Sequence, residues 1–99
     1  MTGNWSIVHG FESKTMTTRA NELVIYDRTF SQMRASDLER NGMGLEVYEG
    51  HDTANVILEI FYAEETGCMT LQTFSSETPL EVVEWAIADA KVSLPPKKG

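Results

Sequence analysis

The stretch that decides the fold is residues 55–94, which read NVILEIFYAEETGCMTLQTFSSETPLEVVEWAIADAKVSL. Its first part alternates with a period of two, as a β-strand does, because successive side chains of a strand point to opposite faces. The segment 64–67 ends in Gly67 and predicts a turn, since glycine readily takes the positive φ of hairpin loops. Alternation resumes from Met69 to Thr73. The stretch therefore begins with a predicted β-hairpin, one face of which is wholly apolar: Val56, Leu58, Ile60 and Tyr62.

A helix is predicted over the second part of the same stretch. Thr78 is a candidate N-cap, Pro79 suits the first helical position, and Glu81 completes a Thr-x-x-Glu capping box. Pro95 and Pro96 end the helix, because proline cannot donate the helical hydrogen bond and disfavours helical geometry in the residue before it. One apolar stripe recurs at steps of three and four residues, and we expect it to lie across the apolar face of the hairpin: Leu80, Val83, Ala86, Ile87, Ala90 and Leu94.

The chain before residue 55 predicts less regular elements. Apolar residues alternate over Glu22–Phe30, which predicts a strand. The polar segment 31–41, SQMRASDLERN, predicts one or two helical turns or an irregular crossover, and its Ser-x-x-Glu spacing resembles a capping box. Leu45–Glu49 predicts a short strand, and residues 50–53 predict a turn.

Strands followed by a terminal helix, without βαβ alternation, predict an α+β fold. We expect an antiparallel, meander-like sheet of four or five strands, with one C-terminal helix packed on one face. Residues 21–94 form this single domain, and residues 95–99 are expected to be a disordered tail. Residues 1–20 are expected to be a partly mobile arm, in which the segment WSIVHGF is an alternative edge strand.

Composition predicts a globular cytoplasmic protein. A chain of 99 residues with 41% hydrophobic residues has room for one core. The single cysteine, Cys68, cannot form an intramolecular disulfide, which suits a reducing compartment. The N-terminal residues lack the basic region and apolar run of a signal peptide. No apolar run approaches the length of about 20 residues that spans a bilayer.

The charge is distributed unevenly along the chain. The net charge is −7, and residues 41–90 contain ten acidic residues and no lysine or arginine. Nucleic acids and anionic membranes are bound through basic residues, so we expect neither as a partner. An acidic surface favours a basic protein partner, although acidity also keeps a small protein soluble without any partner.

Residues able to support catalysis or metal binding are scattered. His9, His51 and Cys68 lack the paired spacing of metal ligands. Asp52 follows His51 directly, and adjacent residues rarely reach the orienting geometry of a catalytic dyad. Cys68 also lies in acidic sequence, which disfavours a nucleophilic thiolate, and the acids at 64–65 lack the oxygen ladder of an EF-hand. We therefore predict no catalytic residue, no metal and no cofactor.

Trp85 is the residue that the helical pattern leaves unexplained. At about 100° per residue, it lies away from the apolar stripe, on the side that also carries Val82, Ala88 and Val92. It packs under the N-terminal arm or a loop, joins two copies of the protein, or anchors a partner, because buried tryptophans dominate interface energetics. The predicted partner-binding residues are the tryptophan and nearby or exposed acids: Glu81, Trp85, Asp89, Glu64 and Glu65.

Three functions are compatible with these features. The leading hypothesis is a non-enzymatic interaction domain that binds a basic protein, in its most concrete form an immunity or antitoxin-like inhibitor, by analogy of size and charge alone. The second is a homodimeric structural or regulatory module, joined through sheet edges or through the Trp85 face. The third is a small-ligand-binding or enzymatic domain that uses the concavity between helix and sheet, which a deep pocket containing His51 or Cys68 would favour.

Overall fold

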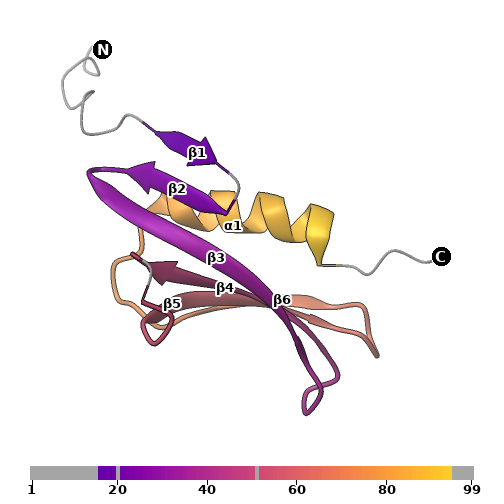
Figure 1. The fold of residues 1–99 in the computed structure, drawn as a ribbon. Coiled ribbons are helices and arrows are strands. Elements are labelled where there is room, and N and C mark those ends of the chain that lie inside the picture. The colour runs from indigo at the N-terminus through magenta and orange to yellow at the C-terminus, as the bar shows by residue number, and fades with distance from the viewer. Residues whose placement is uncertain (1–15, 20, 51, 95–99) are drawn as a thin grey trace.

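The structure, a computed structural model, describes residues 16–19, 21–50 and 52–94, with the backbone alone at Thr17 and Arg19. The expectations for the WSIVHGF segment and for the tail therefore lie outside the described residues. Figure 1 shows the elements of the described part in space. In chain order they are β1 Thr17–Arg19, β2 Glu22–Ile25, β3 Arg28–Asp37, β4 Gly42–Glu49, β5 Val56–Ala63, β6 Met69–Thr73 and α1 Leu80–Ser93.

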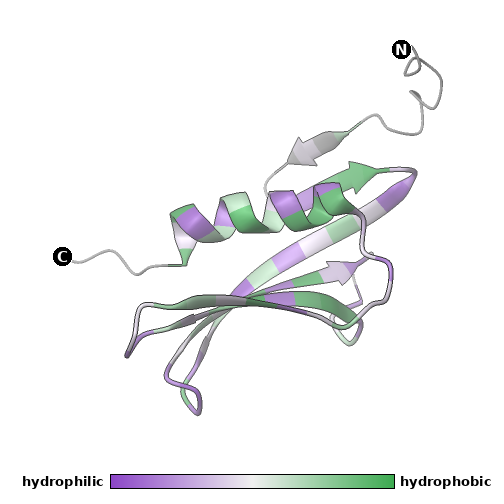
Figure 2. Ribbon diagram, turned by 180° about the vertical axis from the view of Figure 1, so that it is seen from behind, coloured by the Kyte–Doolittle hydropathy of each residue, from purple (hydrophilic) through white to green (hydrophobic). Residues whose placement is uncertain are grey.

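The described strands form one antiparallel sheet in the order β1-β2-β3-β4-β5-β6, so each strand pairs with its neighbours in sequence. α1 crosses one face of this sheet (Figure 1), and the view from behind shows the same two layers (Figure 2). The predicted α+β class, the antiparallel meander and the C-terminal helix on one face are confirmed. The sheet has six strands rather than four or five, and β1 falls within residues 1–20, where an arm was predicted.

The segment Glu22–Phe30 is a hairpin, and the prediction of a single strand there was wrong. The chain reverses at Tyr26 and Asp27, whose φ angles are 57° and 56°. A two-residue loop with two positive φ angles has the geometry of a type I′ turn, whose twist matches that of the flanking strands. The sequence hid this turn because it contains no glycine, the residue that most often marks a type I′ loop.

β3 runs through the polar segment for which helical turns or a crossover were predicted. Its pairing with β4 is continuous from Phe30 to Asp37. The polar residues suit a strand because they alternate: Gln32 and Arg34 share the face of Phe30, and their neighbours share the other. The segment therefore has the period of two that is typical of a strand, although only some of the residues on each face are apolar.

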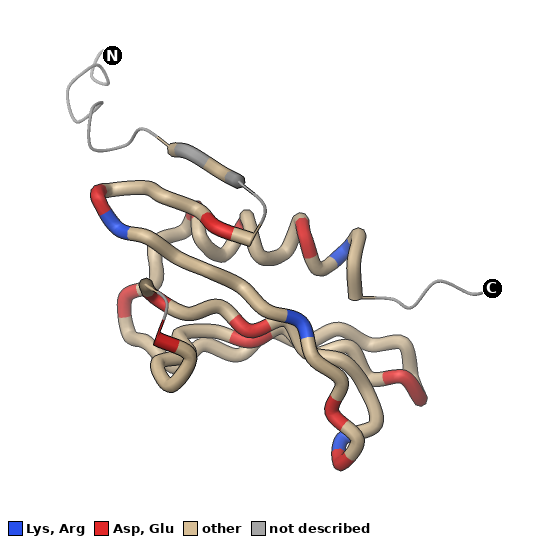
Figure 3. Tube along the Cα trace, viewed as in Figure 1, with Lys and Arg blue, Asp and Glu red and all other residues tan. Residues whose placement is uncertain are grey.

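Asp37 and Arg40 build the β3–β4 turn, and the predicted capping box between Ser36 and Glu39 is not what closes it. The Asp37 carboxylate accepts hydrogen bonds from the backbone N–H groups of residues 39 and 40, and it forms an ion pair with Arg40 at 2.6 Å. Charged residues gather at this turn (Figure 3). Arg40 also forms an ion pair with Glu59 of β5 at 2.7 Å, so the turn is tied to the next hairpin.

β4 begins at Gly42, before the predicted start at Leu45, because its glycines make room for a neighbouring side chain. A Cβ at Gly44 would lie 2.8 Å from Oε2 of Glu59. The Glu59 carboxylate thus packs over the glycine backbone, where the residue is only 8% exposed. Gly42 and Gly44 are thus both strand residues, and Gly44 accommodates a buried carboxylate.

The predicted hairpin of residues 56–73 is confirmed, with one irregularity. Gly67 takes the expected positive φ, at 75°. A β-bulge inserts Ile57 between Val56 and Leu58 in β5. It arises because Tyr48 pairs with Val56, whereas the residue before Tyr48 pairs with Leu58. Ile57 is consequently drawn into the core, and Val56 does not continue the apolar row predicted for it.

The hydrophobic core lies between α1 and the sheet, and it is centred on β2 to β5. Burying a large aliphatic or aromatic side chain contributes about 1.5–3 kcal/mol, so this cluster is the main source of stability. β6 contributes no fully buried residue to it. The buried core residues are Leu23, Ile25, Phe30, Leu45, Val47, Ile57, Leu58, Ile60, Val82, Ala86, Ala90 and Leu94.

The start of α1 differs from the prediction, and its end agrees with it. The N-cap is Pro79, not Thr78, and no side chain caps the helix. The Thr78 hydroxyl is buried and has no hydrogen-bond partner among the described residues. Ser93 is the last helical residue, next to Leu94 and the two prolines that follow.

α1 is rotated about its axis relative to the predicted orientation. Its buried residues are Val82, Ala86 and Ala90, spaced by four. Val82, assigned to the outer side, is 0% exposed, whereas Leu80, assigned to the buried stripe, is 68% exposed. The apolar pattern was ambiguous because α1 carries hydrophobic residues over much of its circumference (Figure 2). Two alanines in the contact row let the helix approach the large side chains of the sheet.

We expect Val82→Ala to destabilise the protein more than Leu80→Ala. Val82 is fully buried, so losing its methyl groups should cost about 1.5–3 kcal/mol. Truncating the exposed Leu80 should change the free energy of unfolding by about 0.5 kcal/mol. Urea unfolding of both variants measures the difference. The opposite order would show that the helix adopts the rotation predicted from its pattern.

Candidate functional site

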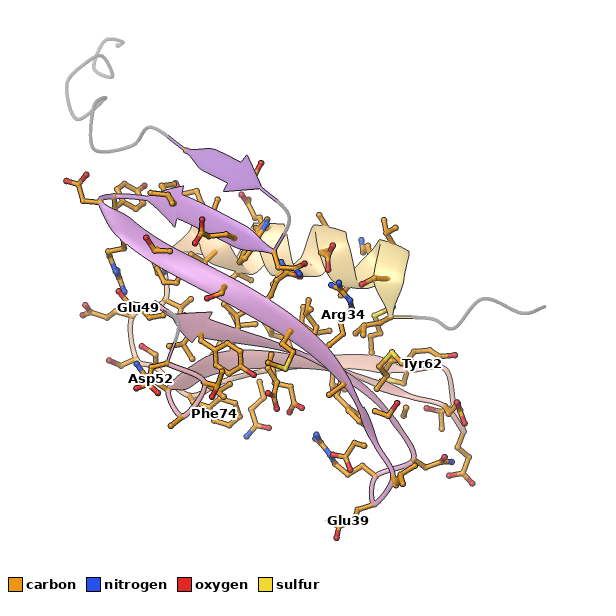
Figure 4. All side chains as sticks on the ribbon, in the orientation of Figure 1. Arg34, Glu39, Glu49, Asp52, Tyr62 and Phe74 are labelled. Atoms are coloured by element: carbon orange, nitrogen blue, oxygen red, sulfur yellow. The ribbon has the colours of Figure 1, made fainter. Side chains whose placement is uncertain are left out.

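The flank of α1 that carries Trp85 is packed against the sheet. Trp85 is partly buried and contacts the hydrophobic core. On either side of it, Glu81 accepts a hydrogen bond from the Tyr26 hydroxyl at 2.8 Å, and Asp89 forms an ion pair with Arg34 at 2.8 Å. Figure 4 shows Arg34 directed from β3 toward the helix. The structure thus brings three of the predicted partner-binding residues together, and each has a contact inside the protein.

These contacts give the Trp85 flank a structural role. The hydrogen bond to Glu81, followed by burial, raises the pKa of Tyr26. This bond joins the β2–β3 turn to the first turn of α1. The other two predicted partner-binding residues, Glu64 and Glu65, are exposed in the β5–β6 turn and are not beside the tryptophan. The predicted set is therefore divided between two parts of the surface.

The opposite flank of α1 borders an open groove. The groove lies between α1 and β6 and has a volume of about 230 Å³. Its walls are mostly apolar, and Leu71 in its β6 wall is 44% exposed. The lining residues are Ile60, Met69, Thr70, Leu71, Ile87, Ala90 and Lys91.

The groove is a consequence of the rotation of α1. Because the row from Val82 to Ala90 faces the core, Ile87 lies at the edge of the buried row and lines the groove next to β6. α1 does not cover β6, since four of the five residues of β6 are exposed. Two residues of the predicted apolar stripe, Ile87 and Ala90, thus form the α1 wall of the groove together with Lys91, and β6 forms the other wall.

β6 also presents an open backbone edge, because among the described residues it pairs with β5 alone. Backbone groups alternate in direction along an antiparallel strand. The Phe74 N–H donates to the carbonyl of Ile57, and the Cys68 carbonyl accepts from the N–H of Ala63. Even-numbered residues therefore face β5. The residues whose N–H and C=O groups point to the open edge are Met69, Leu71 and Thr73.

Exposed acidic residues lie on α1 and on the segments before and after β6, the elements that form the groove. Glu64 and Glu65 precede β6, Glu77 follows it, and Glu84 lies on α1; all are exposed. Lys91 is the single basic residue in the lining. β6 itself carries no charge, and the β5–β6 turn at its start is acidic (Figure 3). The result is an apolar site with an acidic border, which attracts positively charged groups.

A second polar cluster lies on the sheet face opposite α1. Glu46 and Glu59 are directly paired across β4 and β5, an unfavourable arrangement for two carboxylates. Arg40 pairs with Glu59 at 2.7 Å, and the Tyr48 hydroxyl donates to Glu46 at 2.7 Å. Burial, together with the hydrogen bond to Glu46, raises the pKa of Tyr48 to about 12. The members of this cluster satisfy one another, which indicates a structural network.

The candidate catalytic residues are not assembled in the described part of the chain. Cys68 is exposed just before β6 and does not line the groove. His9 and His51 lie outside the described residues, so the His51–Asp52 pair stays untested. Within the described ranges, no group of three or more His, Cys, Asp or Glu side chains is placed to hold a metal ion.

Comparison with known proteins does not assign a family. No family model, no curated protein and no solved structure matches the chain. In residues 16–94, apart from the undescribed positions 20 and 51, no helix is long and apolar enough to cross a membrane. The groove is therefore the basis for a functional proposal.

The residues of the groove were missed at the sequence level. Leu71 and Met69 belong to a strand that was predicted, but nothing in the pattern showed that this strand would be an edge. The available signal was positional: in a meander, the last strand before the helix lacks a following partner unless the chain returns to it. Lys91 and Ile87 were recognised as helical, but the rotation that turns them toward β6 was not predicted.

We expect Trp85→Ala to lower the free energy of unfolding by about 2 kcal/mol, because truncating a fully buried tryptophan costs about 3–5 kcal/mol and Trp85 is only partly buried. Val92→Ala is the control, since Val92 lies on the same helix and is 77% exposed. That variant should stay within about 0.5 kcal/mol of the parent protein. Unchanged stability in Trp85→Ala would indicate that the tryptophan anchors a partner.

We expect stability to fall as the pH rises from 10.0 to about 12, because the folded protein holds Tyr48 protonated while the unfolded chain ionises it at the ordinary pKa. Below this range the contribution of Tyr48 is complete. Phenolate absorbance during an alkaline titration, with Tyr48→Phe as the comparison, measures the shift. If the parent protein shows an additional phenolate step near pH 10.0 that Tyr48→Phe lacks, Tyr48 is not held in this way.

Proposed function

We propose that this protein is a small acidic interaction domain that binds a basic segment of another protein and catalyses no reaction. The observation that carries the proposal is the groove between α1 and β6, which is apolar inside, acidic at its border and open along a strand edge. Leu71 at 44% and Leu80 at 68% exposed are the apolar groups that a partner would cover. Exposed apolar surface rimmed by polar residues is typical of protein interaction sites.

Electrostatics supports a basic partner. Three arginines whose side chains the structure describes form ion pairs inside the protein: Arg28 pairs with Glu49, Arg34 with Asp89, and Arg40 with Glu59. Near the groove, four exposed acids, Glu64, Glu65, Glu77 and Glu84, outnumber the one lysine of the lining, Lys91. A cationic segment approaching this side is attracted over a distance of about 10 Å at 0.1 M salt. The attraction speeds the encounter and favours basic over acidic partners.

The most concrete form of the proposal is an immunity or antitoxin-like inhibitor that neutralises a basic protein such as a nuclease. It is supported by size and charge, 99 residues with a net charge of −7. A cytoplasmic location belongs to the same proposal and is supported by the single cysteine. Of the residues first predicted to bind the partner, Glu64 and Glu65 remain in the proposed surface. Glu81, Trp85 and Asp89 each have a contact inside the protein, which supports a role for them in the fold.

Homodimerisation is the second candidate, and the uncharged edge of β6 is the observation that favours it. Edge strands usually carry lysine or proline, which prevent them from pairing with other chains. β6 has neither. Two copies, each with a net charge of −7, repel one another. A homodimer is therefore less favoured than a complex with a basic partner.

A small-ligand site is less well supported. Ligand pockets typically enclose about 300–1,000 Å³ and offer several convergent polar groups. The groove has about 230 Å³, and its only charged lining residue is Lys91. A groove of this size suits one or two apolar side chains of a peptide better than a whole small molecule.

We expect capture of basic proteins from an extract of the source cells to depend on Glu84 and to be insensitive to Glu39. Both residues are exposed, and Glu→Lys changes the net charge equally at either position. Glu84 borders the groove, whereas Glu39 lies at the tip of the β3–β4 turn (Figure 4). Glu84→Lys should weaken capture several-fold, because a repulsive rim charge slows association.

Added salt should weaken the same complex, since exposed charges are screened. Binding measured by surface plasmon resonance at increasing ionic strength checks this for each captured protein. The proposal fails if the captured proteins are not basic, if their affinity is indifferent to salt, or if Glu84→Lys and Glu39→Lys bind alike.

A further inference from the structure

We infer that the basic segment joins the sheet as an additional strand, antiparallel to β6, with alternate apolar side chains seated in the groove. This inference rests on the proposed function and adds the manner of binding. The open edge, the groove and the acidic border belong to one continuous surface along β6. Addition of a strand to a sheet edge is an established way for a domain to bind an extended peptide.

The direction of the β6 backbone supplies the hydrogen bonds. Met69, Leu71 and Thr73 each offer one N–H and one C=O to the open edge, as the pairing with β5 requires. Because the five-residue strand is about 17 Å long at 3.4 Å per residue, a segment of five to seven residues would cover it. All pairings in this sheet are antiparallel, and an antiparallel strand continues the same ladder.

The side chains of β6 decide which residues of the segment enter the groove. Leu71 pairs with Ile60 and lines the groove. The same residue therefore directs its backbone groups to the open edge and its side chain to the groove. A residue that exchanges both hydrogen bonds with Leu71 has its own side chain on the same face. The segment therefore needs an apolar residue at that position and at every second position from it.

The remaining positions of the segment suit basic residues. They alternate onto the face of Thr70 and Gln72, which carries no positive charge in β6. The ends of the segment come close to Glu64 and Glu65 at one end of β6 and to Glu77 at the other. An alternating pattern of apolar and basic residues thus complements both the groove and its border.

A second copy of this chain fits the same edge less well. Antiparallel pairing of β6 with β6 of another copy places the acidic β5–β6 turn of each molecule near Glu77 of the other. Acid then faces acid at both ends of the shared ladder. A basic segment converts both contacts into attractions, and for this reason we assign the edge to a foreign chain.

The test uses a synthetic peptide, acetyl-Lys-Val-Lys-Val-Lys-Val-Lys-amide, and two N-methylated forms of it. In the proposed arrangement the valine N–H groups face β6 and the lysine N–H groups face solvent. N-methylation of the three valines should weaken binding by about tenfold or more, because the hydrogen bonds to the edge are lost. N-methylation of the internal lysines should leave the affinity within about twofold, since those groups have no partner in the sheet. Isothermal titration calorimetry at low salt measures all three peptides.

A matched pair of protein variants locates the site. Leu71 and Met33 are 44% and 45% exposed on strands, but Leu71 lines the groove and Met33 lies on β3, outside it. Leu71→Lys should abolish binding of the unmodified peptide, and Met33→Lys should preserve it. Thermal unfolding of both variants verifies that each is folded, and amide shifts in ¹⁵N spectra should concentrate in β6 and α1.

The outcomes separate this inference from the proposed function. Equal loss or equal retention with the two methylated peptides overturns strand addition, while the proposed function stands if binding remains salt-sensitive and Glu84→Lys weakens it. If N-methylation of the lysines blocks binding and N-methylation of the valines does not, the lysine N–H groups face β6. That result overturns the antiparallel direction. The absence of saturable binding by the unmodified peptide overturns the inference. Concentration-dependent dimerisation that Leu71→Lys removes assigns the edge to a second copy and overturns both.

Discussion

The seating of α1 on the sheet is the constraint on which the rest of this structure depends. The row Val82, Ala86 and Ala90 is buried, and two polar contacts on one flank hold the helix in that rotation. Arg34 reaches Asp89, and the Tyr26 hydroxyl reaches Glu81. A different rotation would withdraw both acids from these partners and expose the tryptophan between them. The polar contacts therefore select one orientation of a helix whose hydrophobic pattern permits several.

The chosen rotation leaves one side of the sheet incompletely covered. The core gathers over β2 to β5, and β6 remains a mostly exposed strand attached through its pairing with β5. Ile87 then lines a groove beside the core, and Leu71 of β6 lines the same groove. Natural sheets normally protect such an edge with charges or bulges. Here the edge is uncharged and straight, and the protecting charges lie at its ends, which is consistent with a surface kept open for a partner.

Ion pairs with arginine distinguish the early strands of the sheet from the acidic surface around β6. Arg28 lowers the pKa of Glu49, and Arg40 lowers that of Asp37, mainly through direct hydrogen bonds. Arg40 also lies 4.1 Å from the centre of the Phe61 ring and compensates the buried Glu59. These arginines belong to residues 28–40, so they neutralise the early strands and their neighbours. The acids before and after β6, and Glu84 on α1, are exposed at the surface.

The sequence by itself determined the elements that carry a strong local signal. Alternation from Val56 to Thr73 with Gly67 between predicted the β5–β6 hairpin, and the prolines after Leu94 predicted the end of α1. These signals are local because the backbone preferences of glycine and proline and the period of a strand act over a few residues. The acidic segment 41–90, which has no lysine or arginine, was also evident from the sequence. The β2–β3 turn was not, because Tyr26 and Asp27 have positive φ angles without the glycine that usually marks such a turn.

Only the tertiary structure decided which face of α1 is buried, and with it the candidate site. A helix with apolar residues around most of its circumference has no single preferred rotation, and contacts with residues more than fifty positions away select one. The status of β6 as an edge is likewise a property of the whole sheet, since no strand sequence states which of its sides will be paired. For that reason the sequence left open whether Trp85 packs inside the protein or lies at an interface, and it did not reveal the groove beside Leu71.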